Sequence, residues 1–540
     1  MIKIDINFPD QSGQSAFVLK QSVDSEKDLL IVYDLYNFLS NKNVLKKQFL
    51  KESIIDIYLL ESILFLGKYH KKNFSKKEYK VPQYGLRKII NEMDIKTNEI
   101  TDYRENWIVD YAKKLQNQAV EYNVYDYYIN IEIEFVLSLF ELTKQGISVD
   151  SDKINKTKEK LQNAKQKLYF SLEKNNVPGI DLNALNDWAK GYGFYEYFPR
   201  TDSEIYFNDL PLLEEKHQVF KIFKRLNKLN RVGNFLSKLT QDSKIYPEYK
   251  TIGTVTGRCT AKNPNVMGIP KIFRPIIIPS KKGLGIVECD YAQMEVGVIA
   301  ALSNDRKLIE DFNTGDVYSS VGSWLFGKTE KSYRPKAKIL FLGILYGMSK
   351  KMISKHLDIT ISKVDSIFKK FFNKYSAVAI YLSQLEIDGG KNGYAQNIFG
   401  LKRYRYERNI QPSYWEKNWF KNFPVQSTAA VIFKKAIISI KKHLQNQQFN
   451  LLVPLYDSIV FEGPINKIEN ITNQVVDYMI KSMKDVFPVL EPKISVNKNN
   501  TSCWNDNGKV NSIEKFLSDP LHDIDIYEHK IGNVDWTKYL

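Results

Sequence analysis

Two apolar, strand-like runs that lie far apart in the chain each lead into a single aspartate. The first run, GIVEC at 285–289, ends at Asp290, and residues 291–299 then change to helical spacing. The second run, LLVPL at 451–455, is typical of one arm of a β-hairpin whose tip holds Asp457. If the two strands are neighbours in one sheet, their carboxylates converge at its edge.

A converging pair of carboxylates has two ordinary explanations. Aspartates next to strands are common as turn and helix N-cap residues without a chemical role. Alternatively, Asp290 and Asp457 bind magnesium, which prefers hard oxygen ligands and takes one or two protein carboxylates beside water and phosphate oxygens. Two such ions, roughly 3.5–4 Å apart, can activate an attacking oxygen and stabilise a leaving one. Spacing alone does not decide between these explanations.

A third segment, RPKAKILFLGILYG at 334–347, favours the metal-site interpretation. Arg334, Lys338, Leu342 and Tyr346 recur at every fourth residue. Such spacing drifts only about 40° per step around a helix, so the four side chains share one face. Two cations followed by an aliphatic and an aromatic side chain suit a polyphosphate and its base. The alternative is an amphipathic core helix with a solvated basic end.

Five segments occur in the order that is typical of one polymerase family. They are TVTGRCTAKNPNVMGIP, DYAQMEVGVIAALS, RPKAKILFLGILYG, NFPVQSTAA and YDSIVFE. This order resembles the family A (DNA polymerase I-like) DNA polymerases, and the resemblance runs from about Glu132 to Trp504. It implies an α+β multidomain fold: a right-hand polymerase with an antiparallel palm sheet and helical fingers and thumb, plus a small α/β exonuclease-like N-terminal domain.

The resemblance implies roles for the charged residues. Asp290 and Asp457, with the backbone carbonyl of Tyr291, would bind two Mg²⁺ ions, for which Mn²⁺ is expected to substitute. Arg334 and Lys338 would bind the triphosphate of the incoming dNTP, and Lys338 would assist catalysis as pyrophosphate leaves. The expected activity is that of a DNA-directed DNA polymerase, which adds dNTPs to a primer 3′-hydroxyl by two-metal-ion nucleotidyl transfer.

Other residues would shape nucleotide and DNA binding. Glu295 matches the family's steric gate, which occupies the space that a ribose 2′-hydroxyl needs, and Tyr346 matches the tyrosine that stacks near the templating position. Arg258 and Gln426 match residues that contact the minor groove of primer-template DNA, where acceptors lie at similar places in every base pair. Alternatively, they are a surface arginine and a polar residue at a helix N-terminus. Further expected contacts are Gln293, Leu342 and Tyr318 to the dNTP, and Asn265, Asn422 and Tyr456 to DNA.

Four positions depart from the family pattern. Leu342 stands where a phenylalanine or tyrosine usually touches the incoming sugar. Tyr456 and Ser458 replace the histidine and glutamate that usually flank Asp457, so a third carboxylate near the metals is missing. Tyr318 stands where a histidine usually approaches the triphosphate, and a phenol can donate a hydrogen bond but is not a cation near neutral pH. We expect these changes to tune rate and fidelity without abolishing activity.

The first 130 residues resemble a reduced 3′–5′ exonuclease domain. ESIIDIYLLESIL, which contains Asp56, and YNVYD, which ends at Asp126, match segments of that domain. The first metal-binding motif is reduced to DIN at 5–7, and Asp34 and Phe38 stand where an asparagine and an aspartate are expected. Because exonuclease hydrolysis uses the same two-metal chemistry, these losses predict an inactive domain that is kept as a scaffold, without proofreading.

The sequence pattern divides the chain into six segments. We expect an exonuclease-like domain (1–130), a thumb with connecting helices (131–250), the first part of the palm (251–305), the fingers (306–419), the second part of the palm (420–504) and a C-terminal extension of unknown role (505–540). Helical periodicity is predicted at 131–172, 213–239 and 307–385, and a hairpin at 393–405.

The charge of the chain fits a polyanionic partner. Its 540 residues include 78 lysines and arginines against 62 acidic residues, a formal net charge of +16. Three cysteines show neither zinc spacing nor a disulfide pattern, and no apolar run reaches the roughly 18 residues of a membrane span. We expect an intracellular monomer of the cytoplasm, the host cytoplasm or an organelle, with primer-template DNA, dNTPs and replication accessory proteins as partners and no membrane. The composition suits a phage, plasmid or organelle replication system.

Two other functions stay open at this point. A single-subunit RNA polymerase shares the two aspartates and the Arg-Lys-Tyr-Gly helix, but it is not expected to keep Glu295 together with the TGR and PVQSTAA segments. The second is a noncatalytic nucleic-acid-binding relative, because the YDS segment at 456–458 departs from the family pattern on both sides of the aspartate. Such a protein would have no need of Asp290, Arg334, Lys338 and Asp457 together.

Overall fold

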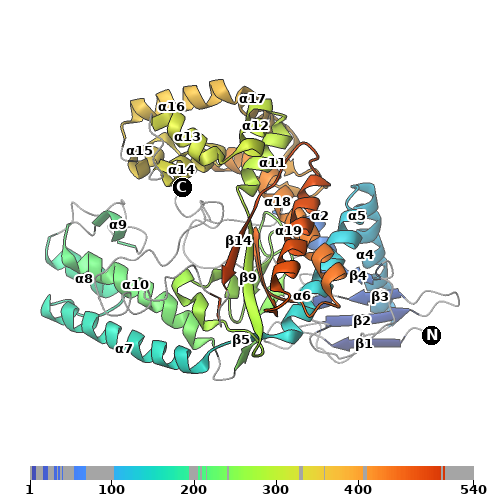
Figure 1. Ribbon diagram of the computed structural model, residues 1–540, viewed down its shortest axis with the longest axis horizontal. Helices are drawn as coiled ribbons and strands as arrows, with labels where there is room; N and C mark the ends of the chain where they lie inside the picture. The colour runs from blue at the N-terminus through green and yellow to red at the C-terminus, as the bar shows by residue number, and fades with distance from the viewer. Residues whose placement is uncertain are drawn as a thin grey trace.

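The structure, a computed structural model, describes residues 3–7, 16–21, 29–32, 34–36, 39, 51, 54–67, 102–193, 205–206, 210–213, 216–239, 243–326, 333–357, 359–405, 410–499 and 503–504. Figure 1 shows these residues arranged around a central sheet, the palm. Helices α12–α17, the fingers, lie above it, and helices α7–α10, the thumb, lie below it to the left. The N-terminal part lies to the right.

The palm sheet is four-stranded and antiparallel, as predicted. Its strands are β9 (Leu284–Tyr291), β12 (Asn450–Leu455), β13 (Ser458–Pro464) and β14 (Ile494–Asn499), in the order β12-β13-β9-β14. β9 is an inner strand, paired with β13 on one side and β14 on the other. Three regions that are distant in sequence therefore meet along β9.

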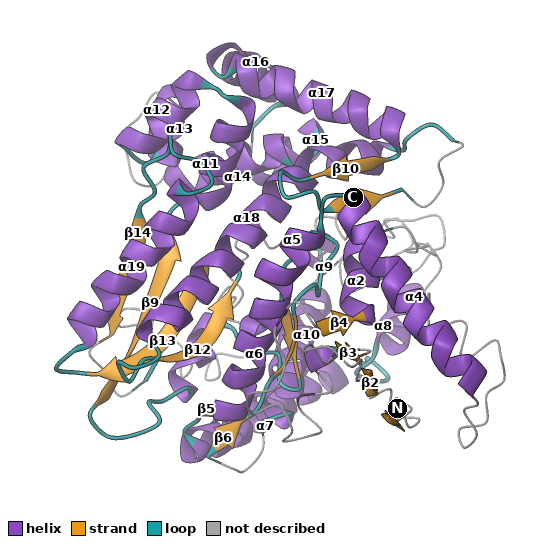
Figure 2. Ribbon diagram, turned by 90° about the vertical axis from the view of Figure 1, so that its right-hand side faces the viewer, coloured by secondary structure: helices purple, strands orange, loops and turns teal. Residues whose placement is uncertain are grey.

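Helices α18 (Tyr414–Leu444) and α19 (Ile468–Lys484) run alongside the palm sheet (Figure 2). α18 begins with a capping box, in which Ser413 and Glu416 each accept a hydrogen bond from the other's backbone N–H. By length and composition α18 could cross a membrane, but its most apolar window is 83% buried inside the fold, as in a core helix. α18 also runs through the boundary between fingers and palm that we predicted at residues 419–420.

Where the structure describes them, the fingers are helical over the range predicted from periodicity. They comprise α12 (Arg306–Thr314), α13 (Val317–Phe326), α14 (Tyr333–Leu345), α15 (Lys350–Leu357), α16 (Ile361–Lys374) and α17 (Ser376–Asn392). Phe341 packs edge-on against Tyr318 and Phe371, with ring centroids 5.9 and 5.2 Å away. β10 (Tyr394–Gln396) and β11 (Lys402–Tyr404) then form the predicted hairpin.

The thumb comprises α7 (Ser151–Lys174), α8 (Leu182–Gly191), α9 (Leu210–Leu213) and α10 (Gln218–Ser237). The helical periodicity predicted at 131–172 is confirmed except around Gly146, where the helix breaks. This residue has a φ of +69°, which favours glycine, and it ends α6 (Glu134–Gln145). The chain then pairs β5 (Ile147–Ser148) with β6 (Lys244–Ile245) before α7 begins.

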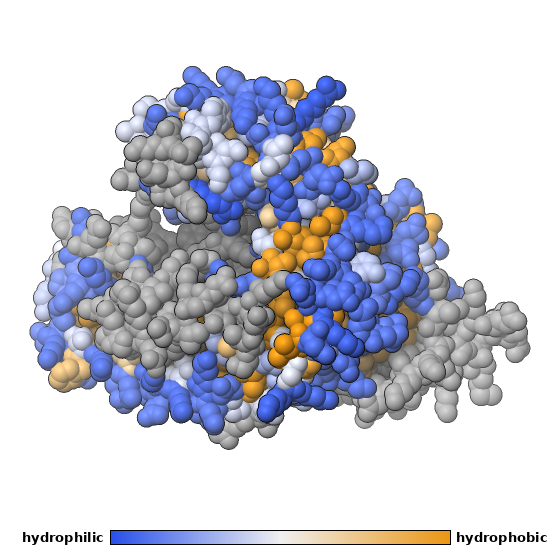
Figure 3. Space-filling model, in the orientation of Figure 1, coloured by the Kyte–Doolittle hydropathy of each residue, from blue (hydrophilic) through white to orange (hydrophobic). Residues whose placement is uncertain are grey.

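The surface is hollowed between fingers and thumb in the space-filling view (Figure 3). In the same orientation, Figure 1 places β9 and β14 beside this hollow. Apolar surface gathers on the palm below the fingers (Figure 3). The palm edge therefore lies where the two helical parts face each other.

The N-terminal part is a small α/β unit, as predicted. Its sheet has the order β1 (Lys3–Asn7), β2 (Ala16–Gln21), β3 (Leu29–Val32) and β4 (Ile54–Asp56), with only the β3–β4 pair parallel. Helices α2 (Ile57–Leu64) and α4 (Asp102–Glu121) pack against each other beside it. Phe38 and the extension predicted at 505–540 lie outside the described residues.

A buried ion pair joins the segment after α4 to the palm. This segment forms α5 (Tyr125–Tyr127) and the π-helical turn η2 (Tyr128–Ile133), which holds the fully buried Glu132. Lys434 of α18 binds the Glu132 carboxylate, and the Tyr127 hydroxyl donates a hydrogen bond to it. Removing either charge would leave the other buried and unpaired, so this pair fixes how the N-terminal helices lie against α18.

Candidate active site

The register of the palm sheet brings Asp290 and Asp457 to one edge. Asp290, on β9, lies directly opposite Ser458 on β13. The backbone N–H of Tyr291 donates a 3.0 Å hydrogen bond to the backbone carbonyl of Asp457. Both aspartates are half-buried. Two carboxylates predicted from separate strand-like runs are therefore neighbours at adjoining strand ends.

The turn between β12 and β13 is only two residues long, Tyr456 and Asp457. Tyr456 adopts a left-handed backbone with φ of +57°, and the Asp457 N–H bonds to the Leu455 carbonyl at 2.6 Å. A tight turn has little freedom, so the Asp457 carboxylate is held close to the sheet. Asp457 lies in this turn, as predicted, and the next residue, Ser458, is the first residue of β13 and is fully buried.

The donor set at this edge fits magnesium that is shared with a substrate. Within the described ranges, no group of three or more His, Cys, Asp or Glu side chains could hold a metal ion by itself. Magnesium is usually bound by one or two carboxylates plus substrate phosphates and water, which is what Asp290 and Asp457 offer. The carbonyl of Tyr291 follows Asp290 on β9, and the Tyr291 hydroxyl anchors this strand end by donating to Met479 O at 2.6 Å.

The first turn of α11 (Met294–Ser303) holds Glu295 beside the aspartates. Gln293 starts the helix with a left-handed backbone, φ of +59°, which turns the chain away from the sheet. Arg258 forms an ion pair with Glu295, and both side chains are about seven-eighths buried, 12% and 13% exposed. Burial is the largest influence on the pKa of Glu295 and raises it. The positive charges of Arg258 and Lys338 lower this pKa, and the negative charge of Asp457 raises it further. Glu295 is therefore paired with Arg258 and also feels the charges of Asp457 and Lys338.

Arg258 reaches this cluster from a compact loop between β7 (Glu248–Lys250) and β8 (Thr260–Lys262). The Thr254 hydroxyl accepts a hydrogen bond from the Arg258 N–H at 3.1 Å, and Gly257 has a φ of +75°. The Arg258 guanidinium lies over the ring of Tyr456, 5.9 Å from its centre. The alternative of a surface arginine is therefore wrong for Arg258.

The cations predicted to bind triphosphate lie on α14, as expected. Arg334 forms an ion pair with Asp316, in which Arg334 Nε lies 2.6 Å from Asp316 Oδ2. The Arg334 guanidinium also lies over the ring of Tyr318, 5.5 Å from the ring centre. Hydrogen bonds from Ser319 and Arg334 outweigh burial and lower the pKa of Asp316. Tyr318 is buried, and burial followed by the charge of Glu295 raises the pKa of its hydroxyl. Lys338, one turn after Arg334, is half-buried.

The apolar end of the predicted helix face is buried. Leu342 and Tyr346 are each 3% exposed, and the Tyr346 hydroxyl has no hydrogen-bond partner in the part of the chain that the structure describes. The next residue, Gly347, has a φ of +70°, and a Cβ there would lie 2.1 Å from Asn418 Oδ1. Asn418 and Tyr414 of α18 both donate to the Gly347 carbonyl, at 3.1 and 2.7 Å. The end of α14 is thereby fastened to α18.

The remaining predicted DNA contacts differ in their surroundings. Asn422 and Gln426 lie one turn apart inside α18, so the alternative of a helix N-terminal residue is wrong for Gln426. Gln426 is 8% exposed, and Asn422 Oδ1 is buried without a partner among the described residues. Asn265 is exposed and caps the short helix η4 (Val266–Gly268) by accepting from Gly268 N at 3.1 Å.

Comparison with known proteins decides the family. Residues 201–506, more than half of the chain, match the family described as DNA polymerase family A. This chain belongs to DNA polymerase family A. A solved structure titled as the POL domain of Pol1 from M. smegmatis in complex with DNA primer-template and dNTP has the same fold, with a TM-score of 0.70 at 19% identity, covering 84% of this chain and 82% of that one.

Curated members of family A are longer than this chain. DNA polymerase I of Bacillus subtilis (strain 168) is 26% identical over 396 residues, which cover 68% of this chain and 45% of that protein. The thermostable DNA polymerase I of Thermus aquaticus is 26% identical over 306 residues, covering 52% of this chain and 36% of that protein. The chain thus spans less than half the length of these relatives.

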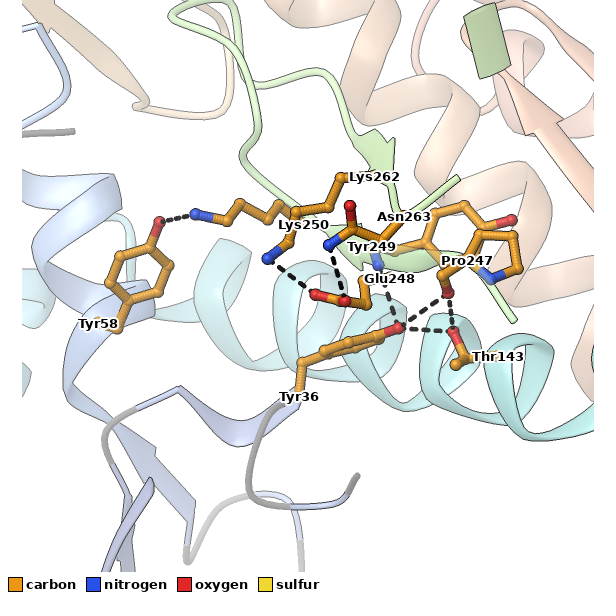
Figure 4. Close-up of polar contacts among 9 residues, drawn as sticks. All are labelled: Tyr36, Tyr58, Thr143, Pro247, Glu248, Tyr249, Lys250, Lys262 and Asn263. Atoms are coloured by element: carbon orange, nitrogen blue, oxygen red, sulfur yellow. Dashed lines mark hydrogen bonds and ion pairs between the residues drawn. The ribbon is translucent and has the colours of Figure 1, made fainter. Parts of the chain in front are cut away.

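In this family A chain, the N-terminal part is tied to β7, the strand that leads into the loop holding Arg258. The Tyr36 hydroxyl accepts a 3.0 Å hydrogen bond from Tyr249 N and lies 2.5 Å from Thr143 Oγ1 and 3.3 Å from Pro247 O (Figure 4). Thr143 in turn donates to Pro247 O at 2.8 Å. One buried tyrosine therefore joins the N-terminal part, α6 and the start of β7.

The carboxylates of the predicted exonuclease-like segments differ in their surroundings. Asp56 is buried, and its side chain accepts from the backbone N–H groups of Asp34, Leu35 and Leu59. Burial, and then the charge of Asp34, raise the pKa of Asp56 to about 7. Asp126 is exposed at α5. Asp5-Ile6-Asn7 lies on β1, an edge strand.

Sequence reasoning missed two acidic residues near the predicted site. Asp316 was not predicted as the partner of Arg334, because the pair depends on how α13 packs on α14. Glu288 was also missed, although a carboxylate inside the apolar run at 285–289 was a visible signal. It lies two residues before Asp290 and is 8% exposed.

Proposed function

We propose that this chain is a template-directed DNA polymerase that adds dNTPs to a primer 3′-hydroxyl. The observation that supports this most is the register of β9 and β13, which brings Asp290 and Asp457 to one palm edge. The charges of Asp457 and Lys338 both act on the Glu295 carboxyl, Asp457 raising its pKa and Lys338 lowering it. Family relatives are named DNA polymerase I, and the fold relative is titled as a complex with primer-template and dNTP. We extend that activity and those substrates to this chain.

The chemistry follows from the residues at the palm edge. Asp290, Asp457 and the Tyr291 carbonyl would hold two Mg²⁺ ions, or Mn²⁺, which would activate the primer hydroxyl and stabilise the leaving pyrophosphate. Arg334 and Lys338 orient the triphosphate of the bound dNTP. Donors that are already in place stabilise developing charge without reorganising at the moment of reaction. Arg334 is paired with Asp316 in the structure and would exchange this carboxylate for phosphate when a nucleotide binds.

Glu295 selects deoxyribonucleotides by filling the space next to the sugar. Its ion pair with Arg258 fixes the side chain and prevents it from swinging away from the site. This pairing supports a DNA polymerase over a single-subunit RNA polymerase, because a fixed carboxylate next to the sugar would exclude a 2′-hydroxyl. Arg258 can still reach the minor groove through its remaining donors.

The N-terminal part acts as a scaffold without proofreading. Asp56, the best preserved exonuclease-like carboxylate, is committed to three backbone N–H groups, and Asp126 is exposed. We further propose that the protein is a cytoplasmic or organellar monomer, in host cytoplasm if phage-encoded. It would work with accessory proteins in replication or repair of a phage, plasmid or organelle genome.

A primer-extension gel tests these proposals together. Wild-type protein with Mg²⁺ should extend a matched primer with dNTPs and not with rNTPs, and Asp290→Asn should not extend it. A primer with a mismatched, 3′-labelled end should keep its label. Release of that label by Asp290→Asn protein would contradict the loss of proofreading, and extension with rNTPs alone would favour an RNA polymerase.

A further inference from the structure

Glu288 is a buried carboxylate directly behind the predicted metal site. It lies on β9 two residues before Asp290, so both side chains project from the same face of the sheet. A buried carboxylate is tolerated only when donors surround it. Glu288 therefore needs partners, and they come from three other segments of the chain.

The partners of Glu288 converge on its two oxygens. Arg274 Nη1, from the short helix η5 (Lys271–Ile276), lies 3.1 Å from Oε2, and Trp504 Nε1 lies 3.0 Å from the same oxygen. Ser458 Oγ donates to the other oxygen, Oε1, at 3.1 Å. The Arg274 guanidinium lies over the Trp504 ring, 4.4 Å from its centre. The backbone N–H of Trp504 donates a hydrogen bond to the backbone carbonyl of Ile277.

Ser458 makes this cluster relevant to the site. It follows Asp457 in the chain and lies opposite Asp290 in the register, so it is bonded to one aspartate and faces the other across the sheet. Its hydrogen bond to Glu288 runs diagonally from β13 to β9. The bond therefore ties the strand end that holds Asp457 to the strand that holds Asp290.

We propose that Glu288 is a positioning residue for the aspartate pair, which acts through Ser458 to fix the separation of the two carboxylates. The inference rests on the proposed function, in which Asp290 and Asp457 hold the metal ions. Arg274 neutralises the Glu288 charge, so the carboxylate supplies orientation and does not compete for the ions. Some residues do not bind the metal but hold its ligands in place through hydrogen bonds. Removing such a residue typically lowers metal affinity or activity by about 10–100-fold.

Ser458→Ala tests whether Glu288 positions the aspartates or only stabilises the fold. The variant keeps Arg274 and Trp504 on Glu288, so the carboxylate stays paired and the sheet should fold. We expect the Mg²⁺ concentration for half-maximal extension to rise about tenfold, with the KM for dNTP and the metal-free affinity for primer-template unchanged. Ser458→Thr keeps the hydroxyl and should restore most of the loss.

Ser495→Ala is the matched control. Ser495 lies opposite Asp290 on the other neighbouring strand, β14, and is exposed, so the same chemical change is made at the equivalent register position. Glu288→Gln is a second test, because its amide oxygen can still accept from Ser458 while the ion pair with Arg274 is lost. We expect it to lower thermal stability more than it changes the Mg²⁺ requirement.

Metal binding is measured separately from activity. Free Mn²⁺, followed by its electron paramagnetic resonance signal, is titrated against each protein with a dideoxy-terminated primer-template and dNTP. Binding about tenfold weaker in Ser458→Ala than in Ser495→Ala supports the inference, and equal binding in the two variants overturns it. A wild type that binds Mn²⁺ but does not extend a primer would contradict the proposed polymerase function alone.

Discussion

Arg258 and Glu295 form a largely buried ion pair that joins the loop before β8 to the first turn of α11. Each side chain was predicted for a separate task, minor-groove contact for Arg258 and sugar selection for Glu295. The ion pair couples the two tasks, because a shift of the loop would move the gate. Discrimination against ribonucleotides should therefore respond to changes at either residue.

Replacing Glu295 tests whether its volume or its charge excludes ribonucleotides. Glu295→Ala opens the space beside the sugar, so the ratio of kcat/KM for rNTP to that for dNTP should rise roughly tenfold to two-hundredfold. Glu295→Gln keeps the volume and should change the ratio by less than about threefold. Steady-state single-nucleotide incorporation measures both. An equal rise in the two variants would show that the charge, and not the volume, is the gate.

The ion pair between Arg334 and Asp316 should compete with nucleotide binding. In Asp316→Ala the Arg334 guanidinium no longer has to leave a carboxylate, so we expect the KM for dNTP to fall about twofold to fivefold. Stability should change by less than about 1 kcal/mol, because both side chains are substantially exposed. Arg334→Ala should raise the KM instead. A higher KM in Asp316→Ala would show that Asp316 positions Arg334 for the nucleotide.

The hydroxyl of Tyr346 should destabilise the free protein. It is buried and has no hydrogen-bond partner within the described residues, so Tyr346→Phe should raise the free energy of unfolding by roughly 0.5–1 kcal/mol. Tyr346→Ala should lower it by about 3–5 kcal/mol through the cavity it leaves. Thermal denaturation compares the two variants. A less stable Tyr346→Phe would mean that the hydroxyl is bonded in the free protein.

The Tyr36 hydroxyl should hold the N-terminal part against β7. Tyr36→Phe leaves the buried N–H of Tyr249 without an acceptor, which should destabilise the protein by about 1–3 kcal/mol. Tyr122→Phe removes the same group from a side chain that is 37% exposed and should have an effect below about 0.5 kcal/mol. Urea unfolding measures both. Equal stabilities would show that the contact in Figure 4 contributes nothing.

Asp56 should make the stability of the N-terminal part depend on pH. Its pKa is about 7 in the folded state against an ordinary 3.8, so between these values the native state binds more protons than the unfolded state. The free energy of unfolding should then fall as pH rises from about 4 to about 7, by up to about 1.4 kcal/mol per unit. The free energy of unfolding of wild type and of Asp56→Asn is measured at several pH values. It should depend less on pH in the variant.

Asp34 supplies the control for this pH dependence. The charge of Asp34 raises the pKa of Asp56, so Asp34→Asn should lower that pKa. The pH range over which the free energy of unfolding falls should then end at a lower pH. Glu248, Lys250 and Lys262 of the β7–β8 hairpin line the same small cavity and face both aspartates. A profile that is unchanged in both variants would assign the pH dependence to other groups.

Local patterns were sufficient to predict the elements that hold the site. The apolar runs before Asp290 and Asp457 are strands, and the fourfold spacing from Arg334 marks one helix, because both signals depend on short-range periodicity. The helical periodicity predicted over 131–172 is interrupted only around Gly146, where the glycine itself was a local signal. The alternative of a helix N-terminal position for Gln426 was wrong, because α18 begins at Tyr414 and includes Pro424.

Contacts between distant segments could not be predicted in the same way. The pairs Arg258–Glu295 and Arg334–Asp316 depend on how loops and helices pack, and no spacing in the sequence encodes that packing. The Glu288 cluster similarly assembles residues from four separate segments. The family resemblance indicated which residues matter, and the structure showed which of them share contacts.

Single-turnover extension of a primer by one nucleotide tests the central claim most directly. With saturating dNTP and Mg²⁺, Asp457→Asn and Asp290→Asn should each slow the reaction at least about a thousandfold while primer-template affinity in a metal-free gel shift stays within about threefold of wild type. This result would confirm that the paired strand ends are the catalytic centre. Extension by either variant at a rate within tenfold of wild type would contradict it.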